Sequence, residues 1–299
     1  MVSKMINSYH LWNNKTTVWF IGVIVASIVF RVVFLLSTSY VTATDSEAYI
    51  DFAKQIAQHN LTQDNGFRTP GYPIFMALFA NNLNLVRIAQ MALGILITAI
   101  LFMIVWTLTH NTLLPVLAAA SYGLNLSLIT YENTILTETL ATFLVVLSVA
   151  LFIFILEKIV SRRSILVELL VLGGVSAFVA LVRPLFLFLS PLYGIIILVK
   201  LLQENYQRRR LLLFVFFVPF ILLVGGWSTY NYMRFGYWGP STGTGYSLAD
   251  HSIRYIQYAP DQFAIIRDIY LAVGKQLGTT NLNVWSGDAI NRVLRKTGW

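Results

Sequence analysis

Long apolar runs dominate the chain, and short polar stretches separate them. Lipid offers the backbone no hydrogen-bond partners, so a run of about 20 apolar residues predicts a helix that crosses a membrane. The long uncharged stretch 88–131 is about twice that length, and we divide it at the polar residues 109–112. The pattern predicts transmembrane helices near residues 18–36, 88–108, 112–131, 139–156, 165–182, 185–202 and 211–233.

The connection between the first two predicted spans, residues 37–71, has a pattern of its own. Its apolar positions recur at the spacing of one helix face: Tyr49, Phe52, Ala53 and Ile56. Charged residues between them face elsewhere, which predicts an amphipathic helix on the membrane surface. Its start fits a capping box, in which the Thr44 hydroxyl accepts from the Glu47 amide and Glu47 reaches back.

Residues 234–299 are polar enough to lie in water, so we predict a membrane core over 1–233 followed by this separate segment. Basic residues orient the core, because cytoplasmic loops carry an excess of Lys and Arg. With the N-terminus inside, nine basic residues are cytoplasmic: Lys4, Lys15, Lys158, Arg162, Arg163, Lys200, Arg208, Arg209 and Arg210. Four are outside: Lys54, Arg68, Arg87 and Arg183. The loop 37–71 and the C-terminal segment are therefore expected to be extracytoplasmic.

Composition excludes several classes of protein. Hydrophobic residues make up 57% of the 299 positions and charged residues 11%, whereas a soluble domain has about 25% charged residues. This excludes a soluble enzyme, a disordered chain and a coiled coil. The net charge of +8 reflects cytoplasmic Lys and Arg, and we expect no nucleic-acid partner. The chain has no cysteine, so disulfides, thiolate metal sites and a Cys nucleophile are excluded.

Acidic residues are few, and six of them fall on the predicted outer side: Asp45, Glu47, Asp51, Asp64, Glu132 and Glu138. Asp45 has two interpretations. It is a first-turn carboxylate that the helix dipole stabilises by about 0.3–1 kcal/mol, or it is a general base at the level of the lipid headgroups. Glu138 opens an uncharged span, where it is either an ordinary N-terminal acid or part of a site.

Three arginines also carry alternatives. Arg68 begins the sequence Arg-Thr-Pro-Gly-Tyr-Pro, whose prolines fix a rigid turn. That turn is either a stiff re-entry into the membrane or a device that holds Arg68 and Tyr72 toward a ligand. Arg183 either reaches outer headgroups or binds a phosphate as a bidentate fork. Arg31, inside the first span, pairs within the bundle or reaches an interface.

Together these motifs resemble a known family. They are Asp45-Ser46-x-x-Tyr49, Arg68-x-Pro70-Gly71-Tyr72-Pro73, Leu136-Thr137-Glu138 and Arg183-Pro184. The chain resembles, over about residues 15–250, the GT-C glycosyltransferases that use polyprenyl-phosphate sugars. The similarity is to the family of protein O-mannosyltransferases and lipid A aminoarabinose transferases (glycosyltransferase family 39). The Arg-x-Pro-Gly-Tyr-Pro turn is its most specific element.

The resemblance implies an all-α membrane enzyme of the inner cell membrane. It implies that Asp45 is the catalytic base of a single inverting displacement, with Glu138 supporting the site. It implies that Arg68, Tyr72 and Arg183 bind the donor phosphate. The partners would be a polyprenyl-phosphate sugar, membrane lipids, and a lipid, glycan or protein acceptor. No cofactor is certain, and a divalent cation shared by Asp45 and Glu138 remains an option.

Two other functions stay open. A transporter or flippase would place charged or helix-breaking residues within several spans. A catalytically inactive relative would keep the fold without the chemistry. The second alternative is motivated by Trp227-x-x-Tyr230-Asn231, which stands where relatives commonly have Arg-Asn.

Overall fold

The computed structural model describes residues 14–61, 66–243 and 253–276. The chain divides into two compact units, Met1–Ser241 and Thr242–Trp299. Within the described residues, the regular elements are all helices, and one isolated parallel bridge joins Val41 to Thr134. The boundary between the units lies eight residues beyond the predicted one after residue 233, because residues 239–241 bind back to the first unit.

In the part of the chain that the structure describes, five helices are long and apolar enough to cross a membrane. They are α2 (Asn14–Ser37), α5 (Leu83–Thr109), α8 (Glu138–Val160), the run Pro184–Gln203 and the run Arg209–Phe235. A bent pair, α6 (Leu113–Gly123) and α7 (Leu126–Asn133), makes a sixth if it counts as one span. These helices are those of a multi-pass membrane protein. The helix α9 (Leu166–Val182) is apolar and has 17 residues.

The long uncharged stretch divides as the polar residues predict. The helix α5 ends at Thr109, and His110 follows in the left-handed region with a φ of 52°. The predicted span 112–131 is a bent pair of helices, because α6 and α7 meet at an angle of 47°. Asn125 causes the break: its side chain accepts from the amides of Ser127 and Leu128 and so caps a new helix.

The two later runs are also interrupted. Residues Pro184–Phe188 form the 3₁₀ helix η2 before α10 (Leu189–Gln203). Pro219 lies inside α11 (Arg209–Phe220), and a π turn, η3 (Ile221–Gly225), joins it to α12 (Gly226–Phe235). Proline lacks the amide hydrogen that an α-helix uses at that position, so Pro219 cannot donate to the carbonyl one turn earlier.

The loop 37–71 contains the predicted amphipathic helix. The helix α3 (Ser46–Ala57) buries Tyr49, Phe52 and Ala53, and it is followed by the short α4 (Gly71–Ala77). The predicted capping box is wrong, because Asp45 is the N-cap residue and no side chain caps the helix. Instead, the Ser46 hydroxyl accepts from the Ala43 amide and donates to the Ile135 carbonyl.

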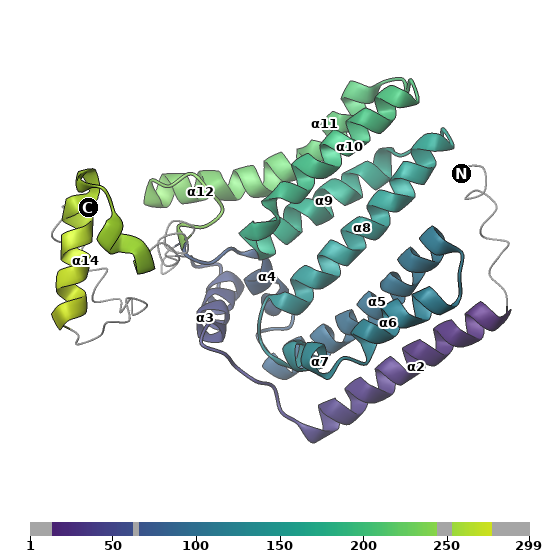
Figure 1. Ribbon diagram of the computed structural model, residues 1–299, viewed down its shortest axis with the longest axis horizontal. Coiled ribbons are helices and arrows are strands. Elements are labelled where there is room, and N and C mark those ends of the chain that lie inside the picture. The colour runs from purple at the N-terminus through teal and green to yellow at the C-terminus, as the bar shows by residue number, and fades with distance from the viewer. Residues whose placement is uncertain (1–13, 62–65, 244–252, 277–299) are drawn as a thin grey trace. The chain divides into compact units, whose positions relative to one another are not determined.

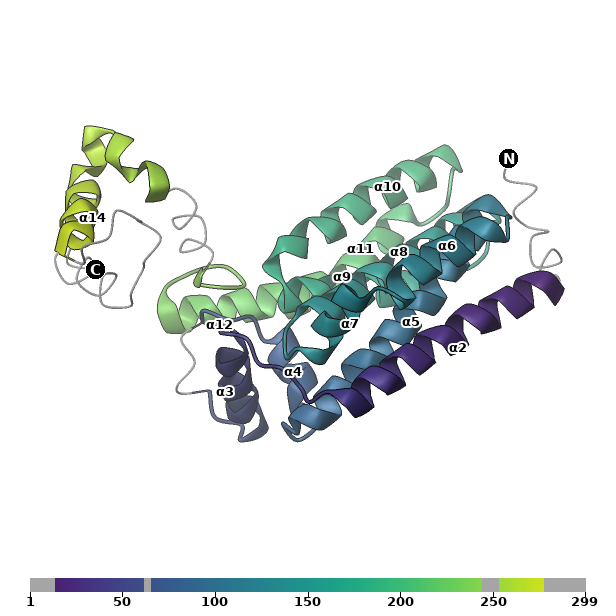
Figure 2. The same cartoon turned by 60° about the horizontal axis from the view of Figure 1, so that its bottom comes forward.

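Within the first unit, Figure 1 shows α5, α8, α9 and α11 side by side, with α2 packed along α5 and α6. The turned view in Figure 2 keeps the same order. The helices α3 and α4 lie at the end of the bundle where α2 and α9 end and α8 begins. The main buried core runs from this end along α8, α9 and α10.

The second unit is described over residues 253–276. It contains two 3₁₀ helices, η4 (Ile253–Tyr258) and η5 (Asp261–Phe263), and then α14 (Ala264–Gln276). Arg267 on α14 pairs with Asp261 and with its neighbour Asp268.

Candidate functional site at one end of the bundle

Asp45 and Arg68 form an ion pair, although 23 residues separate them in the chain. The Arg68 guanidinium donates to the Asp45 carboxylate over 2.6 Å. It also lies 4.8 Å above the centre of the Tyr49 ring and donates to the Tyr49 hydroxyl over 3.3 Å. The Asp45 side chain is 56% exposed, whereas Arg68 is 23% exposed. This pair is therefore open to solvent on the carboxylate side and supported by an aromatic ring on the other.

A second ion pair joins Glu138 to Arg183 at 3.0 Å. Glu138 is the first residue of α8, and Arg183 follows the last residue of α9 in extended conformation. Their side chains are 35% and 40% exposed. The sequence left two partners open for Arg183, lipid headgroups or a phosphate. In this structure its partner is the Glu138 carboxylate.

Tyr49 and Tyr72 connect the two ion pairs. Their rings meet edge to face, with centres 5.3 Å apart. Burial raises the pKa of Tyr49. The Asp45 charge also raises this pKa, whereas the charges of Arg68 and Arg183 lower it. Burial raises the pKa of Tyr72 well above its usual range, and the Glu138 charge adds to this. Both phenols are thus neutral at physiological pH. The second ion pair acts electrostatically on both of them, through Arg183 on Tyr49 and through Glu138 on Tyr72. We call these six residues the end cluster.

Tyr72 is predicted as a phosphate ligand, and its environment is a buried one. The side chain is fully buried, and its hydroxyl donates to Gln90 Oε1 over 2.6 Å. Its ring packs edge to face against the Tyr49 ring, and the predicted role of Tyr72 as a phosphate ligand stays a prediction.

The Arg-Thr-Pro-Gly-Tyr-Pro turn packs directly on the end of α9. The Thr69 hydroxyl donates to the Val182 carbonyl over 3.2 Å. A Cβ at Gly71 would lie 2.7 Å from the backbone of Leu181 and Val182, so only glycine allows this approach. Because Arg183 comes next in the chain, the turn that carries Arg68 is held against the residue that carries the second cation.

Sequence reasoning missed two supports of the end cluster. Ser241 donates to the Phe67 carbonyl over 2.6 Å and so holds the residue before Arg68. On α12, Trp227 donates to the Pro240 carbonyl and Asn231 donates to the Gly239 carbonyl. These bonds hold the segment before Ser241 close to α12. No motif marks such contacts, because they join a side chain to a backbone carbonyl whose place depends on the fold.

The acidic residues predicted on the outer side divide into separate groups. Asp51 is exposed on α3 and pairs with Lys54, and Asp64 lies outside the described residues. Glu132 is fully buried inside the bundle, where it binds Arg31, and its predicted position on the outer side stays a prediction. That contact also answers the question about Arg31, which pairs within the bundle.

A shared metal site for Asp45 and Glu138 remains a prediction. Each carboxylate binds an arginine, and the described part of the chain brings together no group of three His, Asp or Glu side chains that could hold a metal ion. The oxygen ligands that a hard cation prefers are thus present as two separate carboxylates.

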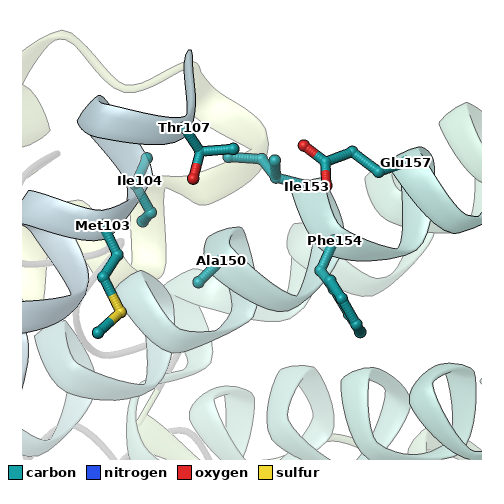
Figure 3. Close-up of a pocket in the computed structure, with 7 residues that line it drawn as sticks. All are labelled: Met103, Ile104, Thr107, Ala150, Ile153, Phe154 and Glu157. Carbon is teal, nitrogen blue, oxygen red and sulfur yellow. The ribbon is translucent and has the colours of Figure 1, made fainter. Parts of the chain in front are cut away.

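A pocket lies elsewhere, between α5 and the second half of α8 (Figure 3). Its lining is apolar apart from Thr107 and Glu157. One oxygen of Glu157 is buried without a hydrogen-bond partner. Because α8 begins at Glu138, this pocket is toward the other end of the helix from the end cluster. Nothing connects it with the residues described above.

The comparisons with known proteins give no support in either direction. No protein-family model, curated protein or solved structure matches the chain. The geometry of the end cluster and the chemistry of its residues are therefore the basis on which a function is proposed.

Proposed function

We propose that the chain is a membrane glycosyltransferase that transfers a sugar from a polyprenyl-phosphate donor to an acceptor hydroxyl. The observation that supports this most directly is the end cluster. Two arginines and two carboxylates gather around buried tyrosines at one end of a largely apolar bundle. A donor with a lipid tail and an anionic headgroup suits such a place, because its tail stays in hydrocarbon while its phosphate meets the arginines.

In the proposed topology the chain crosses the membrane seven times. This count adds the bent pair and α9, whose 17 residues reach the lower end of the range of about 17–25 residues for a span. With the N-terminus in the cytoplasm, as the Lys and Arg distribution favours, the end cluster faces outward. The inner membrane of a bacterial cell is the proposed location, with the C-terminal segment outside.

The proposed reaction is a single displacement. The acceptor oxygen attacks the anomeric carbon while Asp45 takes the hydroxyl proton. The bond from that carbon to the phosphate oxygen breaks, and the electron pair leaves with polyprenyl phosphate. Arginine stabilises the charge that develops on the leaving group. One displacement inverts the anomeric centre, and acceptors are lipid A, a protein Ser or Thr, or another glycan.

The ion pairs add a step to this scheme. Arg68 holds Asp45 at 2.6 Å before any ligand binds, so the base and the phosphate compete for one cation. A donor phosphate that binds Arg68 releases Asp45 from the pair. The carboxylate then becomes available to the acceptor proton at the moment when the donor is in place.

Transfer by the purified full-length chain in lipid nanodiscs tests the proposal. The donors are radiolabelled polyprenyl-phosphate mannose and polyprenyl-phosphate aminoarabinose, offered with lipid A or a Ser/Thr peptide. We expect labelled product from the wild type.

Asp45→Asn should lower the rate of sugar transfer by about 10²–10⁴-fold, the contribution of one general base. Asp51→Asn is the matched control, since Asp51 lies on the same helix and pairs with Lys54 outside the end cluster. Full activity of Asp45→Asn would remove Asp45 from the mechanism.

A transporter is the second candidate, and two observations favour it. An ion pair between Arg31 and Glu132 is buried among the spans, and two spans are broken, at Asn125 and at Pro219. Transporters place charges and helix breaks at such depths. Movement of a fluorescent polyprenyl phosphate across proteoliposome membranes without consumption of the sugar donor would favour this function over transfer.

A further inference from the structure

The ion pair between Arg31 and Glu132, which we call the buried pair, is the most completely bonded polar group described in the bundle. Their side chains are 2% and 0% exposed, and two parallel hydrogen bonds join them, at 2.8 Å and 2.6 Å. The remaining guanidinium nitrogen donates to the carbonyls of Ser27 and Gly123. The residues come from three different helices, α2, α6 and α7, which this network therefore joins.

The neighbouring helix leaves a space of matching shape. A Cβ at Gly94 on α5 would lie 2.1 Å from a Glu132 carboxylate oxygen. A Cβ at Gly123 would lie 2.8 Å from the Thr98 side chain and 3.2 Å from the Ser27 hydroxyl. Gly94 therefore faces the Glu132 carboxylate, and Gly123 packs closely against Thr98 and Ser27 beside the pair. The carboxylate fits in one orientation, which sets the register of α7 against α5 and α2.

The chain on both sides of the buried pair leads to the end cluster. Directly after Glu132, Asn133 accepts from the Val41 amide over 3.1 Å, and the Val41 carbonyl accepts from the Ile135 amide over 2.9 Å. The Asn133 side chain donates to the Ser39 carbonyl. These bonds fasten the segment that leads to Glu138 onto the segment that leads to Asp45. The Ser46 hydroxyl closes the same connection at Ile135.

Gln90 on α5 extends this connection to Tyr72. Its amide nitrogen donates to the carbonyls of Glu132 and Thr134, each over 2.8 Å. Both of its hydrogens are then used, so its oxygen must face the other way, where Tyr72 donates to it. The backbone around Glu132 thus determines where the Tyr72 hydroxyl points.

We propose that Arg31 and Glu132 are positioning residues that set the distance between the two carboxylates of the end cluster. The proposal rests on the proposed function for its chemical consequence. An apolar pair of similar size would pack as well in a bundle and would avoid the cost of burying charges. A bidentate pair differs from it in geometry, since it allows one relative position of α2 and α7 rather than many.

These 299 residues include no cysteine, which allows a direct test. Spin labels at Thr44→Cys and Leu185→Cys, both exposed and next to the two ion pairs, report the distance across the end cluster by pulsed electron resonance. The test variant is Arg31→Met with Glu132→Met, which removes both charges. The control is Tyr193→Phe, which removes a buried hydrogen bond of 2.9 Å between α10 and α8.

We expect a single narrow distance distribution in the wild type and in Tyr193→Phe, and a broadened or shifted one in the double variant. An unchanged distribution in a folded double variant overturns the proposal. If the double variant does not accumulate, Arg31→Lys takes its place, because lysine keeps the charge and loses the bidentate fork. A distribution for Arg31→Lys identical to wild type would overturn the proposal equally.

Turnover provides the second readout. Misplacement by about 1 Å costs up to about 100-fold in rate, so we expect kcat of the double variant to fall by at least about tenfold while KM stays nearly constant. A structural role alone would lower the amount of folded enzyme and leave kcat per folded molecule unchanged. The labels need no substrate. A wild type without transferase activity but with the expected labelling result therefore contradicts the proposed function and leaves the positioning role intact.

Discussion

The described residues of the first unit contain two kinds of arginine–carboxylate pair, one buried and one half-exposed, and in the proposed function only the half-exposed kind takes part in chemistry. Arg31 and Glu132 are almost fully buried, and hydrogen bonds satisfy the guanidinium on every side. The pairs of the end cluster leave Asp45 56% exposed and Arg183 40% exposed. A buried pair cannot exchange its partner for a ligand, because each charge left alone in the bundle is costly. A half-exposed pair can, because water and a phosphate both compete for its arginine.

The largest expected difference in stability is between removing the carboxylate of the buried pair and removing that of a half-exposed pair. Glu132→Leu should lower the free energy of unfolding by about 3–5 kcal/mol, because Arg31 is left buried and unpaired. Glu138→Leu should lower it by about 0–1 kcal/mol, the usual value of an exposed pair. Thermal unfolding of both variants in the same detergent measures the difference. Equal losses would mean that the two environments do not differ in the way the burial indicates.

The glycine that faces Glu132 sharpens the same comparison. Gly94→Ala should destabilise the bundle by about 1–3 kcal/mol, the usual cost of overpacking. The physical reason is the 2.1 Å approach of a new Cβ to the carboxylate. Gly174→Ala is the matched control, since a Cβ there meets nothing within 4 Å. The midpoint of thermal unfolding reports both, and a control that loses as much as Gly94→Ala would show that helix glycines are sensitive in general.

If Asp45 and a phosphate compete for Arg68, removing the Asp45 charge should strengthen phosphate binding and slow sugar transfer. Asp45→Asn should bind polyprenyl phosphate more tightly, by up to about fivefold, because an exposed ion pair is worth about 0–1 kcal/mol. The same variant should transfer sugar about 10²–10⁴-fold more slowly than the wild type. Native mass spectrometry of the wild type, Asp45→Asn and Asp51→Asn with polyprenyl phosphate measures the affinity. Weaker binding by Asp45→Asn would remove the exchange step.

The smallest effect concerns pH. Burial raises the pKa of Tyr49 and Tyr72 above the ordinary 10.0 in the folded state. A phenol whose folded pKa is raised contributes stability that is present below pH 10 and is lost as pH rises through the folded pKa. Ultraviolet absorbance of tyrosinate in wild type and Tyr72→Phe should therefore show no Tyr72 signal until the protein unfolds in alkali. Ionisation of Tyr72 near pH 10 in folded protein would contradict its burial.

The spans are the part of the fold that the sequence predicts well. Helix ends agree closely where a polar residue terminates an apolar run, as at Thr109 and Glu138. The sequence does not predict the bend before α7, because an asparagine within an apolar stretch can equally occur inside a continuous helix. Asn125 becomes a cap only when the backbone around it leaves the helix.

What the sequence determined alone is the kind of molecule: an apolar chain whose long runs must be helical, because hydrocarbon leaves the backbone no other partner. It also marked residues capable of chemistry, among them Asp45 and Arg68. Only the tertiary structure decided the pairing. The partners are 23, 45 and 101 residues apart in the three pairs, and no local pattern constrains contacts at such separations. Burial also distinguishes the pairs, since Glu132 is closed off inside the bundle while Asp45 at its end is 56% exposed.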